Sequence, residues 1–160
     1  MSVADINETI QYLTFKLDEE VFALDVAKVR EILEYSGITK VPQTPDFMRG
    51  VINLRGSVVP VIDLRLKFGM SATVQTVNTC TIVVEVALED ETLVLGVLAD
   101  SVQEVVEMGP EQIEAAPHIG TRLNTDFIKG MGKHDNRFVM ILDIDRLFTS
   151  YDLSSLPAGD

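Results

Sequence analysis

The chain has 160 residues, of which 46% are hydrophobic and 24% are charged, a composition typical of one folded domain of ordinary size. Its net charge is -12 at pH 7, and it contains no tryptophan. Both features argue against nucleic acid as a partner, because phosphates are repelled by an acidic surface and bases stack on aromatic side chains. The first ten residues do not form a signal peptide, and no apolar run approaches the roughly 18 residues of a membrane span. We therefore expect a cytoplasmic protein with no direct membrane insertion.

The first part of the chain is predicted to form strands. Residues 11–17 and 20–26 alternate or run apolar, are rich in β-forming residues and are separated by a short acidic turn, which predicts a hairpin. The run "REILEY" is expected to form the next strand. The two prolines of "ITKVPQTP" then mark an irregular connection.

A second hairpin is predicted at residues 51–62, where "GVINLRGSVVPVIDL" is apolar on both faces apart from one arginine. Two strands, 51–54 and 57–62, are joined tightly at Arg55 and Gly56, and glycine takes the positive φ that a two-residue turn requires. Pro60 has no N–H group, so we expect its strand to lie at a sheet edge or to bulge there.

Strand patterns resume after a loosely patterned connection. The runs "TIVVEVA", "TLVLGVLA" and "VQEVVEM" have the composition of strands. Helical periodicity is weak nearly everywhere, so the chain is predicted to be mainly β with short helices.

An internal repeat is the most informative feature of the sequence. Residues 47–68 align without a gap with residues 127–148, 80 positions later, and the matches include Gly50 with Gly130 and Asp63 with Asp143. Further upstream, "ALDVAKVREI" aligns with "GVLADSVQEV" 73 positions later. Each unit would have about five strands and roughly 70 residues, too few to be comfortably stable alone. We therefore expect two small barrels that pack on a shared core with a groove between them.

The charge is distributed unevenly between the two halves. Residues 1–80 carry 8 Lys/Arg and 10 Asp/Glu, whereas residues 81–160 carry 5 and 15. A local excess of positive charge lies at positions 49–67, where Arg49, Arg55, Arg65 and Lys67 face only Asp63. This region is either a place where a partner docks or a set of solvated surface charges.

Candidate catalytic and ligand-binding motifs have structural explanations. The segment "GMGKHDN" lacks the first glycine and the Ser/Thr of a phosphate loop and is instead the second copy of the central hairpin turn. Asp143 and Asp145 resemble a metal or acid–base pair, but the first copy keeps only Asp63, in a position that suits a helix cap. His118 and His134 have no second histidine or cysteine at ligand spacing, and the chain has one cysteine. The sequence therefore predicts no catalytic residue, no metal and no cofactor.

Several blocks together closely resemble the CheW family, the coupling proteins of bacterial chemotaxis. They are "FKLDEEVFALDVAKVREI", "ITKVPQTPDFMRGVINLRGSVVPVIDLRLKFG", "GVLADSVQEVVEM", "FIKGMG" and "MILDIDRLF". The resemblance covers about residues 10–150 and implies two intertwined, five-stranded, SH3-like β-barrels, with repeat halves at roughly 10–78 and 79–150 and a tail at 151–160. It also implies a non-enzymatic adaptor that joins the cytoplasmic tips of chemoreceptors, in membrane-bound arrays, to the regulatory domain of the histidine kinase CheA.

The resemblance further implies that receptors contact Val29, Glu31, Gly50 and Arg55. At a hairpin tip beside a groove, the Arg55 guanidinium suits a forked contact with a partner carboxylate or carbonyl. An internal ion pair between Arg55 and Glu31 is the alternative, and the two roles are compatible. Two other functions stay open: coupling in a chemosensory pathway that controls gliding, twitching or gene regulation, and an enzyme based on Asp143 or His134.

Overall fold

The computed structural model describes residues 8–87, 91–115 and 127–148, which form a mainly β structure with short helices. No helix in these ranges is long and apolar enough to cross a bilayer. In chain order the elements are β1 (Ile10–Leu17), β2 (Glu20–Asp25), η2 (Val26–Lys28), β3 (Val29–Glu34), β4 (Met48–Leu54), β5 (Ser57–Asp63), α1 (Leu64–Lys67), β6 (Cys80–Ala87), β7 (Thr92–Ala99), β8 (Ser101–Met108), η3 (Pro110–Gln112), β9 (Ile113–Glu114), β10 (Ile128–His134), β11 (Arg137–Leu142) and α2 (Ile144–Leu147).

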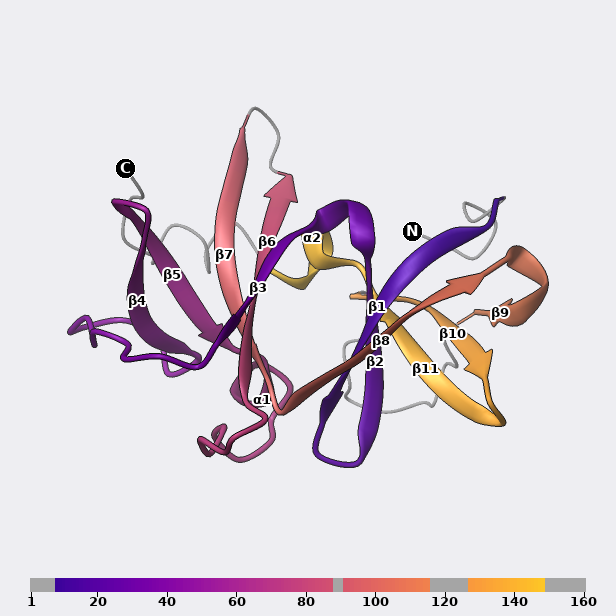
Figure 1. Ribbon diagram of the computed structural model, residues 1–160, viewed down its shortest axis with the longest axis horizontal. Coiled ribbons are helices and arrows are strands. Elements are labelled where there is room, and N and C mark those ends of the chain that lie inside the picture. The colour runs from indigo at the N-terminus through magenta and orange to yellow at the C-terminus, as the bar shows by residue number, and fades with distance from the viewer. Residues whose placement is uncertain (1–7, 88–90, 116–126, 149–160) are drawn as a thin grey trace.

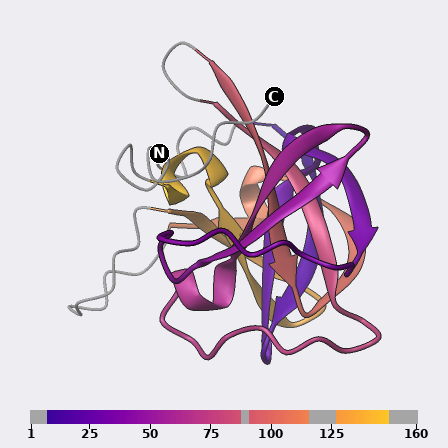
Figure 2. The same cartoon turned by 90° about the vertical axis from the view of Figure 1, so that its left-hand side faces the viewer.

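The strands form two sheets that lie side by side (Figures 1 and 2). One has the order β8-β1-β2-β11-β10-β9 and the other the order β3-β6-β7-β5-β4. The predicted all-β class with two similar sheets is confirmed. The sixth strand of the first sheet is the two-residue β9, which pairs with β10 at Met131. The repeat equivalent of Met131 in the other sheet is Val51, and it makes only an isolated bridge with Thr39.

The two sheets have the same internal order once the repeat is taken into account. Strands β8, β1, β2, β11 and β10 correspond to β3, β6, β7, β5 and β4. Both sheets contain one parallel pair at matching places, β11 with β2 and β5 with β7. As a result, β1 and β2 pair with strands from the second half of the chain, and β6 and β7 pair with strands from the first half. Each sheet is built from both halves.

Pro60 occupies a different setting from the one expected. Its strand, β5, lies between β7 and β4 and is therefore an inner strand. Pro60 is paired with Val51 of β4, but the parallel pairing with β7 begins one residue later, at Val61 and Gly96. Of the two expected settings, the edge strand was wrong for β5. Among the described strands, Pro60 has no partner on the β7 side, and the β4–β5 ladder shifts register nearby, opposite Val61 and Ile62, so the ladder has a local gap that accommodates the missing N–H.

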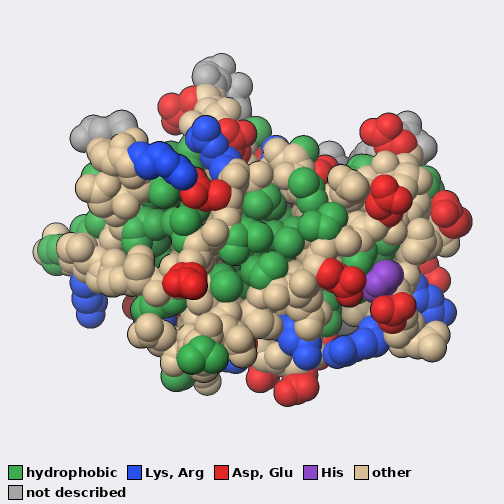
Figure 3. All heavy atoms as spheres, viewed as in Figure 1, with side chains coloured by type: hydrophobic (Ala, Val, Ile, Leu, Met, Phe, Trp, Pro, Cys, Tyr) green, Lys and Arg blue, Asp and Glu red, His purple; other side chains and the backbone are tan. Residues whose placement is uncertain are grey.

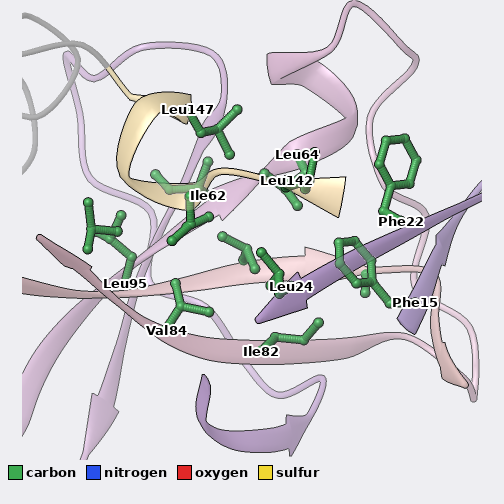
Figure 4. Packing of buried hydrophobic residues seen from close by; sticks show 14 of the residues in the cluster. Phe15, Phe22, Leu24, Ile62, Leu64, Ile82, Val84, Leu95, Leu142 and Leu147 are labelled. Carbon is green, nitrogen blue, oxygen red and sulfur yellow. The ribbon is translucent and has the colours of Figure 1, made fainter. Parts of the chain in front are cut away.

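A shared hydrophobic core joins the two sheets (Figure 4). Its buried members include Phe15 and Leu24 from the first sheet and Ile62, Ile82 and Leu95 from the second. Two smaller clusters lie within one sheet each. The shared core predicted from the size of the repeat is confirmed, and burial of this apolar surface is the main force that holds the sheets together.

A column of stacked phenylalanine rings runs through this core. Phe15 stacks on Phe22 at a centroid distance of 5.9 Å, Phe22 on Phe68 at 5.5 Å and Phe68 on Phe127 at 4.9 Å. Phe68 follows α1 and Phe127 precedes β10, so the column links segments from both halves of the chain. Such offset stacking adds to the stabilisation that burial alone provides.

Asp63 caps α1, as the sequence predicted, and it also fixes the loop that follows this helix. Its fully buried carboxylate accepts hydrogen bonds from the N–H of Arg65 at 3.1 Å, from the N–H and hydroxyl of Thr73 at 2.9 and 2.7 Å, and from the Arg49 guanidinium at 2.9 Å. Asp143 holds the same position before α2, but its side chain makes no capping hydrogen bond. The predicted cap is therefore confirmed at Asp63 only.

Ion pairs between distant segments also hold the two short helices. Arg65 of α1 binds Asp100, between β7 and β8, at 2.8 Å. Burial raises the pKa of Asp100, but hydrogen bonds from Arg65 and from the Asp18 N–H outweigh it, so that the pKa of this carboxyl lies below its usual range. Asp145 of α2, 80 positions after Arg65, accepts from Lys28 and from the N–H of Ala87, both at 2.7 Å. Both copies thus use this helix position for an ion pair with a distant segment, with arginine in the first copy and aspartate in the second.

Candidate docking groove

Arg55 lies at the tip of the β4–β5 hairpin, as predicted. Arg55 and Gly56 have φ values of 53° and 89°, the left-handed conformations of a two-residue hairpin turn. The side chain of Asn53 accepts a hydrogen bond of 2.8 Å from the Gly56 N–H, which stabilises the turn. The Arg55 side chain is 74% exposed.

Arg55 also forms the internal ion pair with Glu31 that the sequence left as an alternative. The two guanidinium nitrogens donate to the two carboxylate oxygens at 2.6 and 3.1 Å. Glu31 belongs to β3 and Arg55 follows β4, and these strands are the opposite edges of the five-stranded sheet. The pair therefore joins the two edges of one sheet. It leaves most of the Arg55 side chain accessible, so pairing and docking remain compatible.

The Arg55 side chain borders a groove of about 740 Å³. The groove has an apolar lining, and charged side chains from β3, the hairpin tip and the start of β7 surround it. On the face shown in Figure 3, hydrophobic side chains form a band with charged side chains around it. The lining residues are Arg30, Glu31, Leu54, Arg55, Ser57, Val58, Val59, Val83, Glu91, Thr92, Leu93 and Val94.

The chemistry of this lining favours binding of a protein over catalysis. It contains neither histidine nor cysteine, and its only groups outside the apolar set are hydroxyls and paired or exposed charges. An apolar centre inside a charged rim is the usual composition of a protein interface. The partly exposed Val58 and Ile32, 37% and 43% exposed, extend apolar surface on this sheet. We name this site the Arg55 groove.

Val29 and Gly50, the other two predicted contact residues, do not line the Arg55 groove. Val29 begins β3 and packs against the shared core. Gly50 is buried with φ 146°, and a Cβ atom there would collide with the carbonyl oxygen of Thr39. Both positions support the strands that carry Glu31 and Arg55. Their contact with a partner stays a prediction.

The positive charges at positions 49–67 do not form a free cationic surface. Arg49 binds Asp63, Arg65 binds Asp100, and Arg55 binds Glu31. Lys67 lies over the ring of Phe47 at 4.7 Å. The sequence count missed these partners because two of the three acids lie outside the counted segment.

The structure also gives structural roles to the acidic residues considered for chemistry. Asp145 holds Lys28 and the Ala87 N–H, as described above, and Asp143 lies 4.0 Å from Arg146. His134 is in β10 beside the second hairpin turn. His118 lies outside the described residues. The apolar groove residues Leu54, Leu93 and Val94 were missed, since alternating apolar residues in a strand predict burial and not a groove.

The ion pair should change the titration of Glu31. The hydrogen bond from Arg55 is the largest influence on the pKa of Glu31 and, with the charges of Arg55 and Arg30, it lowers this pKa against the opposite effect of burial. The stabilisation from ionised Glu31 is therefore present above the unfolded-state pKa and is lost as the pH falls through the folded-state value. We expect the carboxyl carbon of Glu31 to titrate by NMR below the usual glutamate range, and Arg55→Ala to return it toward that range. Equal midpoints in both proteins would contradict the pairing.

Comparisons with known proteins agree with this geometry. A family model described as "CheW-like domain" matches residues 11–152. The chain is 36% identical to chemotaxis protein CheW of Klebsiella aerogenes over 90% of this chain and 84% of that protein, and 32% identical to chemotaxis protein CheW of Thermotoga maritima over 91% and 92%. The crystal structure of the scaffolding protein TtCheW from Thermoanaerobacter tengcongensis matches with a TM-score of 0.79 at 34% identity, covering 89% of this chain and 90% of that one.

Proposed function

The chain belongs to the CheW family of chemotaxis scaffolding proteins, and on this premise we propose that it couples the cytoplasmic tips of chemoreceptors to the regulatory domain of the histidine kinase CheA. The family is non-enzymatic, so the protein acts by holding partners together and has no catalytic site. It works in the cytoplasm, next to membrane-bound receptor arrays. Receptors thereby control the activity of the kinase.

The observation that carries the proposal is the exposed arginine beside an apolar groove. The Arg55 groove offers apolar area for burial and a guanidinium whose position is fixed by Glu31. A fixed guanidinium loses little conformational freedom on binding, and arginines of this kind are common hot spots of interfaces. We infer that the receptor tip contacts Glu31 and Arg55 directly. Val29 and Gly50 contribute through the position of β3 and β4.

A separate surface is available for the kinase domain. Val105 and Phe138, on the six-stranded sheet, are 52% and 56% exposed and offer apolar area for burial by a partner. These side chains lie on the six-stranded sheet, whereas the Arg55 groove lies on the five-stranded sheet, so the two surfaces are separate. Two different partners can therefore be held by one chain. This separation supports coupling between receptor and kinase.

The same architecture suits a chemosensory pathway with an output other than swimming, such as gliding, twitching or gene regulation. The Arg55 groove would serve the receptors of either pathway. Affinity capture of the protein from its native cell, followed by mass spectrometry, distinguishes them by the kinase and response regulator that are recovered.

Arg55→Glu tests the receptor role directly. We expect the dissociation constant for a soluble receptor-tip fragment to rise on the order of thirtyfold, the effect of losing an interface hot spot, while affinity for the kinase regulatory domain stays nearly unchanged. The protein should still fold, because position 55 is at an exposed turn and the equivalent turn has an acid there, Asp135. The melting temperature should fall slightly, because the change removes the ion pair and places two exposed acids side by side. Isothermal titration calorimetry with each partner and a thermal melt provide the measurements.

A charge-swapped double variant, Glu31→Arg with Arg55→Glu, is the matched control. It restores an ion pair at the same place with reversed polarity. If Arg55 serves the receptor directly, receptor binding stays weak in the double variant. Recovery of receptor affinity would mean that the pair is needed only to hold the strand edges, and an unchanged affinity in Arg55→Glu alone would remove the docking role.

A further inference from the structure

The six-stranded sheet carries a second groove that is the internal copy of the Arg55 groove. It encloses about 260 Å³. Every residue that lines this groove is the repeat equivalent of a residue that lines the Arg55 groove. The equivalent residues are 80 positions apart in the sequence for the hairpin and 73 positions apart for β2 and β8. For β1 the equivalent residue follows from the pairing register of the sheets. The matched pairs are Thr14 and Val83, Val21 and Val94, Gln103 and Arg30, Glu104 and Glu31, His134 and Leu54, Asp135 and Arg55, Arg137 and Ser57, and Val139 and Val59.

The ion pair of the Arg55 groove is replaced in the second groove by two acids. Glu104 takes the place of Glu31 on the edge strand, and Asp135 takes the place of Arg55 at the hairpin tip. The backbone is conserved, since Asp135 has φ 52° and Arg55 has φ 53°. Two carboxylates therefore face each other where the first groove has an attractive pair, and they repel unless a cation lies between them.

A histidine completes this cluster. One ligand atom from each of Glu104, His134 and Asp135 lies within 4.8 Å of the other two. The Nε2 atom of His134 is 3.4 Å from a carboxylate oxygen of Asp135. Ligands at zinc distances of about 2.0 to 2.2 Å in a tetrahedral site are separated by about 3.4 Å, so this pair already has the spacing of two zinc ligands. Figure 3 shows acidic and basic side chains gathered around a histidine on this face.

Thr14 positions Glu104 within this groove. Its hydroxyl donates a hydrogen bond of 2.8 Å to the Glu104 carbonyl and accepts one of 3.2 Å from the Glu104 N–H. Both contacts fix the backbone of β8 at the point where its pairing with β1 shifts register. The repeat equivalent, Val83, offers no hydroxyl for such contacts. The threonine therefore holds Glu104 in place on the edge strand.

We propose that Glu104, His134 and Asp135 bind one zinc ion or a similar divalent transition metal, which takes the place of the Arg55 guanidinium and joins β8 to the tip of the β10–β11 hairpin. An imidazole with two carboxylates suits zinc, copper or nickel, whereas calcium and magnesium prefer oxygen ligands alone. Asp135 is 81% exposed, so the fourth position is open to water and the ion is exchangeable. Histidine spacing alone could not reveal this site, because Glu104 comes from a strand 30 positions earlier.

Zinc titration of the full chain, freed of metal with a chelator, tests the proposal. At about pH 7.5, where imidazole is mostly neutral, we expect saturable binding of one zinc ion, with the largest NMR shifts in the ring of His134. Glu104→Gln and His134→Gln should each weaken zinc binding about tenfold or more, since even the loss of a residue that only orients a metal ligand typically costs about tenfold to a hundredfold. His118→Gln is the matched control and should leave the affinity unchanged. Equal affinity in all variants, or shifts centred away from His134, would overturn the site.

Two further variants examine the relation to the first groove. Asp135→Arg is expected to abolish zinc binding and to raise the melting temperature of the metal-free protein, because it recreates the ion pair with Glu104. Arg137, which also lines this groove, adds a positive charge, so Arg137→Ala should bind zinc more tightly. Loss of zinc binding in Arg137→Ala, or tight zinc binding in Asp135→Arg, would overturn the proposal. So would equal binding of magnesium, which would indicate only a diffuse attraction to acidic residues.

Discussion

Replacing Asp63 with alanine is expected to lower the free energy of unfolding by about 3 kcal/mol, the lower end of the cost of breaking a buried ion pair. The carboxylate is fully buried and accepts hydrogen bonds from Arg49, Arg65 and Thr73. Its removal takes the acceptor from the N–H of Arg65 and from the N–H and hydroxyl of Thr73, whereas Arg49 keeps its hydrogen bonds to the Thr73 carbonyl and the Tyr35 hydroxyl. The Arg49 side chain is 28% exposed and can turn to water, which places the cost at the lower end. For a chain of this length the melting temperature should fall by about 10 °C.

The internal repeat supplies a matched control for this change. Asp143 is the equivalent of Asp63, is 10% exposed and makes no capping hydrogen bond among the described residues. Asp143→Ala should therefore cost about 1 kcal/mol or less, the size of an ordinary cap effect. Chemical denaturation of the two variants under identical conditions gives the comparison. Equal losses at both positions would show that burial of Asp63 and its four hydrogen bonds contribute no special stability.

Separating the chain between Asn78 and Thr79 is expected to abolish cooperative folding of both pieces. The sheets exchange strands, so residues 1–78 contain β1 and β2 of one sheet together with β3, β4 and β5 of the other. The shared core draws buried residues from both pieces. Neither piece alone can assemble the native contacts, and the whole net stability, typically about 5 to 15 kcal/mol for a domain, should be lost.

Mixing the two pieces should restore the fold. Each piece supplies the strands that the other lacks, so an equimolar mixture is expected to give dispersed NMR spectra and a single cooperative melt that depends on concentration. The individual pieces should show neither. If one piece gives a sharp spectrum and a cooperative melt alone, its strands can close on themselves, and the exchange of strands is then not needed for stability.

Much of the local structure could be predicted because its causes are local. The apolar alternation of "QYLTFKL" predicts a strand in any context that buries one face. Arg55 and Gly56 specify a two-residue turn through their own conformational preferences, and Asp63 acts on N–H groups close to it in the chain. The repeat could also be found from sequence alone, and with it the two similar units and the shared core.

The candidate site could be predicted only in part. Arg55 is a single charge in an apolar stretch of sequence, which marks it as a candidate, and the family resemblance adds Glu31 as a contact residue. The groove itself could not be predicted, since Leu54, Leu93 and Val94 look like ordinary strand residues until the sheet brings their exposed atoms to one side. The partners of Arg49 and Arg65 could not be predicted, because a count of charges along the sequence does not show which charges lie close together in the folded chain.

The sequence by itself determined the all-β class, the two hairpins, the repeat and the family, because periodicity, turn chemistry and internal similarity are properties of neighbouring or aligned residues. Only the tertiary structure decided which copy of a strand pairs with which. In a repeat each strand has two chemically similar partners, its own and the one in the other copy, so local preference does not choose between them. The connections and the packing of the whole chain do, and they bring Lys28 to Asp145 and Glu104 to Asp135 across distances that no local pattern records.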